Sequence, residues 1–485
     1  MHFEETRTAP DGGGPWHRGL TRYHWFVLIV AALGWLFDTM DQQLFNLARR
    51  PAITELVGGA LPKLGPGATP AEVKSLADRK TKAIDNYGAY ATSIFMVGWA
   101  IGGLFFGVLG DKIGRAKTML LTILLYSIFT GLSALSLGFA DFALYRFLTG
   151  LGVGGEFAVG VALVAEVMPD RARSQALGWL QALSAVGNMT AGLIGIVLGK
   201  IEESGGIGSS WRIMFVIGTL PALLAIAIRS RLKEPERWKA AARADDGAIS
   251  AIEPKLGSIR ELFTDPRLRR NTIVGMLMAF SGVVGLWGIG FFSFDLFRSI
   301  FRSYFEGLGY APAEVNGKLS FWVGIASLVQ NAGSFLGIYA FSKVTVRVGR
   351  KPAFAVAFVL AMASTAFTFA FLGKVFGIAD IFWMVPIMGF CQLSLFGGYA
   401  IYFPELFPTR LRSTGTSFCY NVGRLVAALG PLALGLLTSQ VYHGFAEVHP
   451  SLPIRYAGIT MCAAFLVGLA ALPFAPETKG QPLPE

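Results

Sequence analysis

The sequence predicts an all-α membrane protein in which twelve transmembrane helices form two pseudo-symmetric six-helix bundles. Three observations lead to this fold class. The 485 residues are 53% hydrophobic and only 15% charged, whereas soluble domains carry about 25% charged residues. Twelve apolar runs each approach the ~20 residues that a helix needs to cross a ~30 Å hydrocarbon core. A motif in the first half of the chain also recurs in the second half, 239 residues later.

The apolar runs follow one another with polar segments between them. They cover residues 24–47, 87–109, 118–138, 142–165, 174–199, 211–230, 272–297, 319–341, 353–373, 380–402, 415–438 and 455–474. Lysine and arginine are retained on the cytoplasmic side of short loops, and the hairpin between the second and third runs is basic. We therefore expect a multi-pass protein of the plasma (inner) membrane with both termini in the cytoplasm.

The repeat defines two halves. The pattern E-x-x-P-x-R-x-R-S begins at Glu166 and again at Glu405, and Gly-Arg and Pro-Glu pairs recur at nearly the same offset. We therefore predict two parallel halves joined by a polar linker. The predicted segments are a cytoplasmic tail (1–22), an N-terminal bundle (23–230, with an external loop at 48–86), a cytoplasmic linker (231–270), a C-terminal bundle (271–474) and a second cytoplasmic tail (475–485).

Composition also excludes several classes of protein. The three cysteines, Cys391, Cys419 and Cys462, lie in separate apolar runs without ligand spacing, so we expect no disulfide, metal site or cofactor. The net charge of +11 is explained by basic loops facing anionic lipid, and we expect no nucleic-acid partner. The sequence has no nucleophile–base constellation, histidine cluster or phosphate loop, so we do not expect an enzyme.

A basic hairpin, GVLGDKIGRAK, runs from Gly107 to Lys117 between two apolar runs. We expect Glu166 to bond Arg115 and the loop of Asp111, and so to hold a cytoplasmic gate. An ordinary basic hairpin is the alternative. In the second copy Val346 stands where the acid would be. The residues predicted to form the gate are Gly107, Asp111, Gly114, Arg115, Glu166, Arg173, Glu405 and Arg412.

Four charged side chains lie well away from the ends of apolar runs in the first half, where ionisable groups cost energy and are usually functional. Asp38, Asp41 and Gln42 share a helical face at spacings of three and four residues. Asp41 and Arg146 lie at similar depth, and their pairing would make a proton switch; alternatively, Asp41 is solvated in an external vestibule. Glu156 is either a second proton carrier or a neutral structural group.

Arg424 is the one deeply placed charge of the second half. A guanidinium group matches a carboxylate, so an anionic substrate is its simplest partner; a structural partner such as Glu156 is the alternative. Further polar or aromatic side chains are candidates for the same site, although each type is more often a contact between helices. These candidates are Gln42, Gln181, Asn188, Trp287, Asn331, Gln392, Tyr399 and Asn421.

The hairpin pattern G-x-x-x-D-K-x-G-R-x-K resembles the loop signature of the major facilitator superfamily. The span 1 acids, Arg146 with the glycines after it, Arg424 before Gly430-Pro431 and the closing P-E-T-K-G extend this likeness over most of the chain. Within the superfamily, the chain resembles the metabolite/proton and aromatic-acid/proton symporters and the related sugar and organic-ion porters. The resemblance implies proton coupling by the span 1 acids and Arg146, and substrate binding by Arg424. The aromatic-acid group usually has D-G-x-D in span 1, where this chain has D-T-M-D.

We therefore expect a secondary active transporter that carries a small organic acid together with a proton by alternating access. Its partners are the substrate, the proton and the lipid bilayer. A monomer is expected, because two repeated halves already enclose a site. The alternatives are a proton-coupled sugar or polyol porter, in which Arg424 is structural, and a membrane sensor that kept the fold and lost transport.

Overall fold

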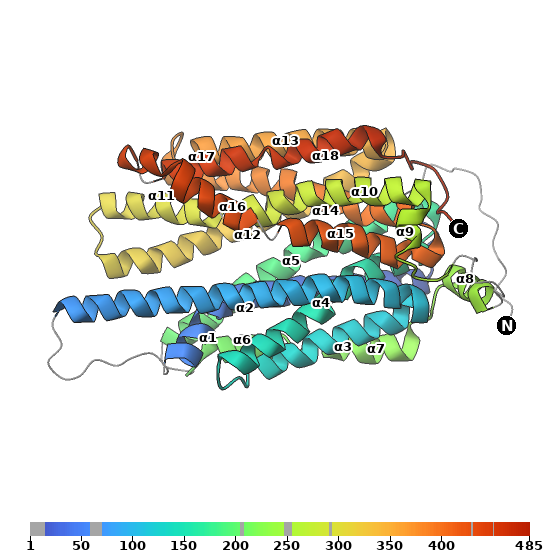
Figure 1. The fold of residues 1–485 in the computed structure, drawn as a ribbon, viewed down its shortest axis with the longest axis horizontal. Helices are drawn as coiled ribbons and strands as arrows, with labels where there is room; N and C mark the ends of the chain where they lie inside the picture. Colours follow the sequence, from blue (N-terminus) through green and yellow to red (C-terminus); the bar gives the residue numbers. More distant parts are fainter. Residues whose placement is uncertain are drawn as a thin grey trace.

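The structure is a computed structural model that describes residues 15–58, 70–203, 208–246, 255–290, 293–427, 430–449 and 451–485. The described residues form helices and connecting turns, without a β-strand. Two layers of roughly parallel helices lie side by side, one blue to green and one yellow to red (Figure 1). The predicted all-α class with two helical halves is confirmed. Parts of the predicted N-terminal tail (1–14) and linker (247–254) lie outside the described residues.

The described part of the first half contains seven helices. Inside a bilayer a chain satisfies its backbone polar groups only by forming helices or closed barrels, so each apolar run becomes helical. The helices are α1 (Arg22–Gly58), α2 (Pro70–Ile113), α3 (Arg115–Ser133), α4 (Phe139–Val167), α5 (Asp170–Glu203), α6 (Ser210–Ile217) and α7 (Ala222–Arg231). The last two together make the sixth span.

The second half repeats this order with more interruptions. Its helices are α10 (Pro266–Val283), η1 (Val284–Gly290), α11 (Ser293–Gly307), α12 (Pro312–Val348), α13 (Arg350–Phe371), η2 (Gly377–Phe382), α14 (Met384–Leu406), η3 (Thr409–Leu411), α15 (Arg412–Ala427), α16 (Gly430–Leu436), η4 (Leu437–Val441), η5 (His443–Glu447), α17 (Leu452–Met461), α18 (Ala464–Ala471) and η6 (Leu472–Phe474). Between the halves lie α8 (Glu236–Asp246) and α9 (Glu261–Thr264).

Ten helices of the described part are long and apolar enough to cross a membrane. The seventh and eleventh predicted spans are divided instead. The seventh runs from α10 through the π-helical η1 to α11, and the eleventh from α15 through α16 to the π-helical η4. With these two the architecture has twelve spans, as predicted.

The predicted external loop at 48–86 differs from the structure. Helix α1 continues to Gly58, and α2 begins at Pro70, so only 59–69 separate them, and these residues lie outside the described set. Residues 71–83, inside the predicted loop, belong to the start of α2. Hydropathy reports where the apolar run ends rather than where the helix ends, and proline is favoured in the first turn of a helix.

Close contacts between helices show the internal repeat in three dimensions. A Cβ atom added to Gly98 of α2 would lie 2.2 Å from the carbonyl oxygen of Phe147 on α4. In the second half, one added to Gly333 of α12 would lie 2.0 Å from the carbonyl oxygen of Pro386 on α14. Glycine lets the backbones of membrane helices approach this closely. The two halves therefore share a packing pattern as well as a sequence motif.

Matching turns join α2 to α3 and α12 to α13. Gly114 has φ +112° and Gly349 has φ +98°, a region that glycine adopts without steric cost. The helices that follow are capped by carboxylates: Glu234 accepts from the backbone N–H of Ala116 at 3.1 Å, and Glu477 from that of Arg350 at 2.8 Å. The sequence repeat pairs Glu477 with Glu236, but in the structure Glu234 has the corresponding role.

The linker contacts both halves at one end of the molecule. Trp238 of α8 donates to the carbonyl oxygen of Asp111 at 2.7 Å, and the Gly257 N–H donates to the carbonyl oxygen of Arg410 at 3.0 Å. Helices α8 and α9 and the C-terminus lie together at this end (Figure 1). We call it the latch end, and the opposite end the mouth end.

Candidate functional site

A cavity of about 870 Å³, including the space at its opening, lies between the two halves. On α1 the residues that line the cavity run from Trp35 to Asn46. At 1.5 Å per residue, Asn46 lies about 16 Å further from the latch end than Trp35 does. The lining residues come from both halves, and they are Trp35, Thr39, Gln42, Gln43, Asn46, Trp99, Gln181, Ser184 and Asn188 of the first half and Leu286, Phe294, Ser327, Gln330, Asn331, Ser334, Leu393, Phe396, Tyr420 and Arg424 of the second.

Arg424 is the one charged side chain among the described residues that line this cavity. Its guanidinium carbon lies 3.6 Å from the ring centre of Trp99 and 4.6 Å from that of Tyr420. The side chain is 3% exposed, and its Nε atom has no hydrogen-bond partner among the described residues. No ion pair in the described part joins Arg424 to Glu156 or to another carboxylate. The cavity therefore presents a buried cation with an unused donor.

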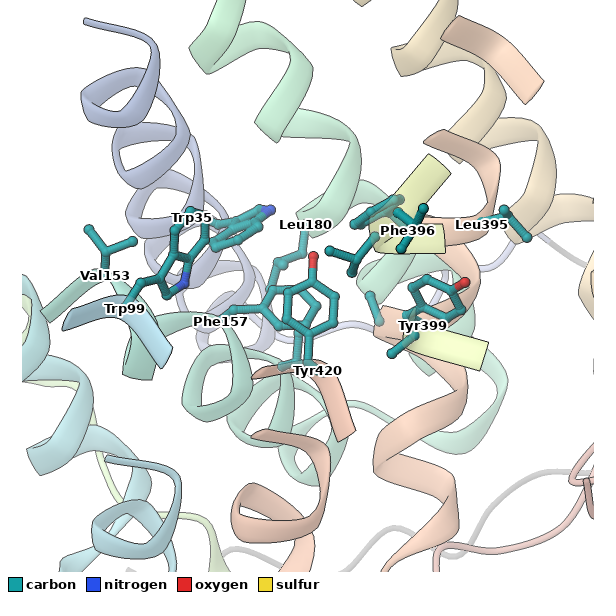
Figure 2. Packing of buried hydrophobic residues seen from close by; sticks show 14 of the residues in the cluster. Trp35, Trp99, Val153, Phe157, Leu180, Leu395, Phe396, Tyr399 and Tyr420 are labelled. Carbon is teal, nitrogen blue, oxygen red and sulfur yellow. The ribbon is translucent and has the colours of Figure 1, made fainter. Parts of the chain in front are cut away.

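Aromatic side chains surround this cation. Trp35 and Phe157 have ring centres 4.7 Å apart, and Phe157 stacks on Tyr420 at 4.5 Å. Figure 2 shows Trp35, Trp99, Phe157 and Tyr420 gathered where the halves meet, with Phe396 across from them. These rings offer flat apolar surface beside the guanidinium group of Arg424.

Four of the predicted polar residues do line the cavity: Gln42, Gln181, Asn188 and Asn331. The Asn188 amide donates to the Asn331 side-chain oxygen at 3.2 Å and so links α5 to α12 across the two halves. The amide oxygens of Gln181 and of Gln330, a residue absent from the prediction, are buried without a partner in the described part. These side-chain amides can accept hydrogen bonds from a polar substrate or donate hydrogen bonds to it.

Three other predicted ligands do not line the cavity. Asn421 donates to the Ser417 carbonyl at 3.0 Å and packs against Gly103, Gln392 donates to Thr365 at 2.8 Å, and Tyr399 donates to the Met278 carbonyl at 2.6 Å. Each therefore serves contacts between helices, which was the alternative reading of these residue types. The side chain of Trp287 lies outside the described residues.

The structure brings Asp41 and Arg146 together inside the first half. Arg146 Nη1 lies 3.7 Å from Asp41 Oδ2, and neither side chain is exposed. The Thr130 hydroxyl donates a hydrogen bond to Asp41 at 2.8 Å and accepts one from Arg146 Nη2 at 3.2 Å. Arg146 also lies 4.6 Å from the ring centre of Phe215. The pair is therefore sealed among α1, α3, α4 and α6 and does not line the cavity.

Asp38 and Glu156 form a second buried acidic site. Both are at most 1% exposed, and their four carboxyl oxygens have no hydrogen-bond partner among the described residues. Gln42 is a polar neighbour of Asp38. Asp38 interacts electrostatically with both Glu156 and Arg424. The two acids thus lie outside the cavity lining, with Asp38 within electrostatic reach of both Glu156 and the cavity cation.

The face of α1 that lines the cavity is not the face predicted from the spacing of Asp38, Asp41 and Gln42. Asp38, Asp41 and Gln42 were expected to share one face, yet only Gln42 lines the cavity. The cavity face of α1 instead carries Trp35, Thr39, Gln42 and Asn46. Because this face is followed every three or four residues, the aspartates fall beside it and point into their own bundle.

The predicted gate residues meet at the latch end. Arg115 Nη2 lies 2.9 Å from Asp111 and 3.0 Å from Glu166, and Arg412 Nη1 of the second half lies 2.9 Å from the same Glu166 oxygen. None of these side chains is exposed. A single glutamate therefore joins one arginine from each half.

Asp111 adds a second link between the halves. Its carboxylate accepts the backbone N–H groups of Ser413 at 3.2 Å and Thr414 at 2.8 Å, and the Thr414 hydroxyl at 2.6 Å. It therefore caps the N-terminus of α15, where an anion is favoured. Beside this cap, a Cβ on Gly107 would lie 2.5 Å from Cβ of Ser417.

The second copy of the gate is arranged differently. Arg350 bonds Glu405 at 2.7 Å within its own half and donates to the Ser174 hydroxyl of the first half at 2.9 Å. Arg173 donates to the carbonyl of Ala165 and pairs with Asp170. Val346, at the position of the missing acid, is 40% exposed. A neutral bond from Gln175 to the Ser342 carbonyl at 3.0 Å crosses the halves instead.

Sequence reasoning missed Trp35, Trp99, Tyr420 and Gln330. Aromatic side chains are common in apolar spans, and hydropathy does not separate a ring that faces a cavity from one that faces lipid. The spacing of Trp35 to Thr39 and Gln42, at four and seven residues, was the available signal for Trp35. Trp99 and Tyr420 could be recognised only after the fold placed them on either side of Arg424.

Comparison with known proteins agrees with this architecture. The family model of the Major Facilitator Superfamily matches residues 82–431. A Haemophilus influenzae protein named for metabolite transport is 28% identical over 465 residues, which are 95% of this chain and 98% of that protein. The cis,cis-muconate transport protein of Acinetobacter baylyi is 29% identical over 348 residues, which are 72% and 77% of the two chains. The solved structure of a proton:xylose symporter has a TM-score of 0.68 at 18% identity and covers 95% and 98% of the two chains.

Proposed function

Because this chain belongs to the major facilitator superfamily, and is therefore a membrane transporter of small molecules and not an enzyme, we propose that it is a proton-coupled symporter of small organic acids. The substrate would bind in the cavity between the halves, and the halves would rock to expose it to each side in turn. The proposal includes a plasma-membrane location with the latch end in the cytoplasm, where the basic hairpin and linker are favoured.

The observation that carries the proposal is the setting of Arg424. A buried cation without an ion-pair partner costs several kcal/mol in desolvation, and a bound carboxylate would offset this cost with charge-assisted hydrogen bonds. The flat rings of Trp99 and Tyr420 beside it suit a planar substrate. The muconate transport relative is named for a compound of this kind, an unsaturated carboxylate.

Proton coupling is assigned to the two acidic sites of the first half. Asp38 lies within electrostatic reach of Arg424 and Glu156, so charging the cavity with a substrate anion would favour a proton on the neighbouring acids. Asp41 and Arg146 form a separate buried pair that a movement of α1 against α4 would open. Both sites are buried, so a proton bound there would not cross the membrane without the substrate.

The gate at the latch end would control which side of the membrane has access to the cavity. With Glu166 bonded across the halves, that end is closed while the cavity lining extends toward the mouth end. Opening would break these links and favour contacts at the mouth end, so that the two states differ in their ion pairs.

Uptake into proteoliposomes tests the proposal. Labelled cis,cis-muconate, nicotinate and benzoate would be offered with and without an inward proton gradient. We expect gradient-driven uptake by the wild type, loss of binding and uptake in Arg424→Gln, and exchange without gradient-driven accumulation in Asp41→Asn. Arg302→Gln, which changes an exposed pair with Glu306, is the control. Wild-type uptake with full gradient dependence in both test variants would refute the assigned roles.

A sugar or polyol porter is the second candidate, and the amide wall favours it. Gln181, Asn188 and Asn331 offer the neutral hydrogen-bonding groups that hydroxyls need. In that case xylose or inositol would shift the melting temperature of the purified protein, and Arg424→Gln would leave this shift unchanged. An absence of counterflow for every acid and sugar would instead favour a sensor.

A further inference from the structure

A second buried donor belongs to a residue that lines the same cavity as Arg424, and it comes from the other half of the protein. The Trp35 side chain lines the cavity and is 4% exposed, and its indole Nε1 has no hydrogen-bond partner among the described residues. Figure 2 shows the indole nitrogen of Trp35 directed away from its own helix, toward Phe396 of the opposite half. A buried N–H without a partner is unfavourable, so its position demands an acceptor.

Trp35 and Arg424 are connected through a continuous aromatic layer. Phe157 lies between Trp35, at 4.7 Å, and Tyr420, at 4.5 Å, and Arg424 rests 4.6 Å from Tyr420. Trp35 belongs to α1 of the first half, whereas Arg424 belongs to α15 of the second. Both unused donors, indole Nε1 and guanidinium Nε, therefore lie on the wall of one cavity but move with different halves.

We propose that Trp35 is a second ligand of the substrate carboxylate, so that one oxygen accepts from the Trp35 indole N–H while the other accepts from Arg424. This inference rests on the proposed transport of organic acids and adds a residue and a consequence to it. A carboxylate has two oxygens with about four acceptor positions, so it satisfies both donors at once. A substrate held in this way bridges the halves.

The bridge gives the carboxylate a role in closing the cavity. A ligand shifts a conformational equilibrium only by its difference in affinity between the two states. In a neutral analogue whose carboxylate is replaced by a carboxamide, an NH2 group takes the place of the second oxygen. This group is a donor and cannot accept from the second N–H. Trp35 would therefore help to discriminate acids from their amides, beyond the charge preference that Arg424 supplies.

The test uses the purified full-length protein and two matched probe pairs, nicotinate with nicotinamide and benzoate with benzamide. Trp35→Phe keeps an aromatic ring but removes the N–H. Loss of a hydrogen bond to a charged group is expected to weaken binding of each acid by roughly tenfold or more, while binding of each amide changes little. Trp322→Phe, a half-buried tryptophan of α12 packed against Phe301 and away from the cavity lining, is the control and should bind as the wild type.

A double-variant cycle separates this inference from the proposed function. Two residues that hold the same carboxylate give non-additive effects, so Trp35→Phe should cost less in an Arg424→Gln background. If Arg424→Gln loses the acids while Trp35→Phe binds acids and amides as the wild type does, the Trp35 ligand is refuted and the proposed function stands. An equal loss for acid and amide would show that Trp35 has only a packing role. Wild type that binds no acid overturns both proposals.

Discussion

Glu166 and Arg412 belong to different halves of the bundle, and their side chains form an ion pair of 2.9 Å in which neither is exposed. The same glutamate oxygen lies 3.0 Å from Arg115 of its own half. Breaking a buried pair by removing one partner leaves an uncompensated charge and costs about 3–5 kcal/mol. Loss of the Glu166 carboxylate would therefore leave two buried arginines, Arg115 and Arg412, without this shared partner at the latch end.

Glu166→Gln is expected to open the latch end, because Arg115 and Arg412 then repel each other without a shared anion. In a background that lacks the three native cysteines, a Ser413→Cys reporter at the buried latch should react with a maleimide faster once Glu166 is changed. Glu236→Gln, in an exposed pair with Lys239, is the matched control and should leave the reactivity low. Equal labelling of both variants would show that Glu166 does not hold the latch.

Two glycine–serine contacts between the halves predict a steric effect. A Cβ on Gly107 would lie 2.5 Å from Cβ of Ser417, and one on Gly178 would lie 2.3 Å from Cβ of Ser342. Overpacking of this kind costs about 1–3 kcal/mol, so Gly107→Ala and Gly178→Ala should each favour the state with the latch open. Gly160→Ala, with no atom within 4 Å of the added carbon, should be silent. The maleimide assay reads all three, and a response from Gly160→Ala as large as the others would remove the steric explanation.

The sequence was a sufficient guide to the fold, because the bilayer leaves few choices. Apolar runs in a bilayer must become helices, and the repeat at Glu166 and Glu405 predicted two halves. The gate could also be located, since charged residues at span ends have few partners other than one another. In the structure Arg115, Glu166 and Arg412 do meet, and the link from Glu166 to the second half could be placed only in three dimensions.

The cavity was harder to predict, because its residues depend on the rotation of each helix. Asn421, three residues before Arg424, packs against Gly103 of α2 and donates to the Ser417 carbonyl of its own helix, and it does not line the cavity. Spans seven and eleven contain π-helical segments, and such a segment changes the register of the residues that follow it. Trp287 lies within the first of these segments, so regular helical spacing does not apply there, whereas Gln181 and Asn188 on the uninterrupted α5 line the cavity.

The C-terminal segment predicts a pH dependence of stability. Burial raises the pKa of Glu477, but the backbone N–H groups of Arg350, Lys351, Lys479 and Thr478 together hold its pKa below the ordinary value of 4.5. A carboxyl group with a lowered pKa in the folded state stabilises the protein above pH 4.5 and loses this contribution as the pH falls through the folded-state pKa.

Glu477→Gln should therefore lower the melting temperature near pH 7 and have a progressively smaller effect as the pH falls below 4.5 toward the folded-state pKa. Thermal unfolding of detergent-solubilised protein from pH 7 down to pH 3.5 measures the difference. Glu447→Gln, at the exposed end of η5, controls for the loss of one carboxyl group. A constant difference in melting temperature across this range would show that ionisation of Glu477 is not involved.

The two buried acidic sites of the first half should respond in opposite ways to neutral substitutions. The carboxyl oxygens of Asp38 and Glu156 have no hydrogen-bond partner in the described part, whereas Asp41 is paired with Arg146 and accepts from Thr130. An unpaired buried charge is costly, while loss of one partner from a buried pair costs about 3–5 kcal/mol. Asp38→Asn and Glu156→Gln are therefore expected to keep or raise the melting temperature, and Asp41→Asn to lower it.

If Asp38 and Glu156 also take up the coupled proton, their neutral variants should exchange substrate but fail to accumulate it. Counterflow in proteoliposomes without a pH gradient measures exchange, and uptake under an inward proton gradient measures coupling. The structural and functional effects are thus separable, because a variant that is as stable as the wild type and still active in counterflow cannot have lost accumulation through misfolding. Gradient-driven accumulation at the wild-type level in both variants would leave the Asp41–Arg146 pair as the remaining proton site.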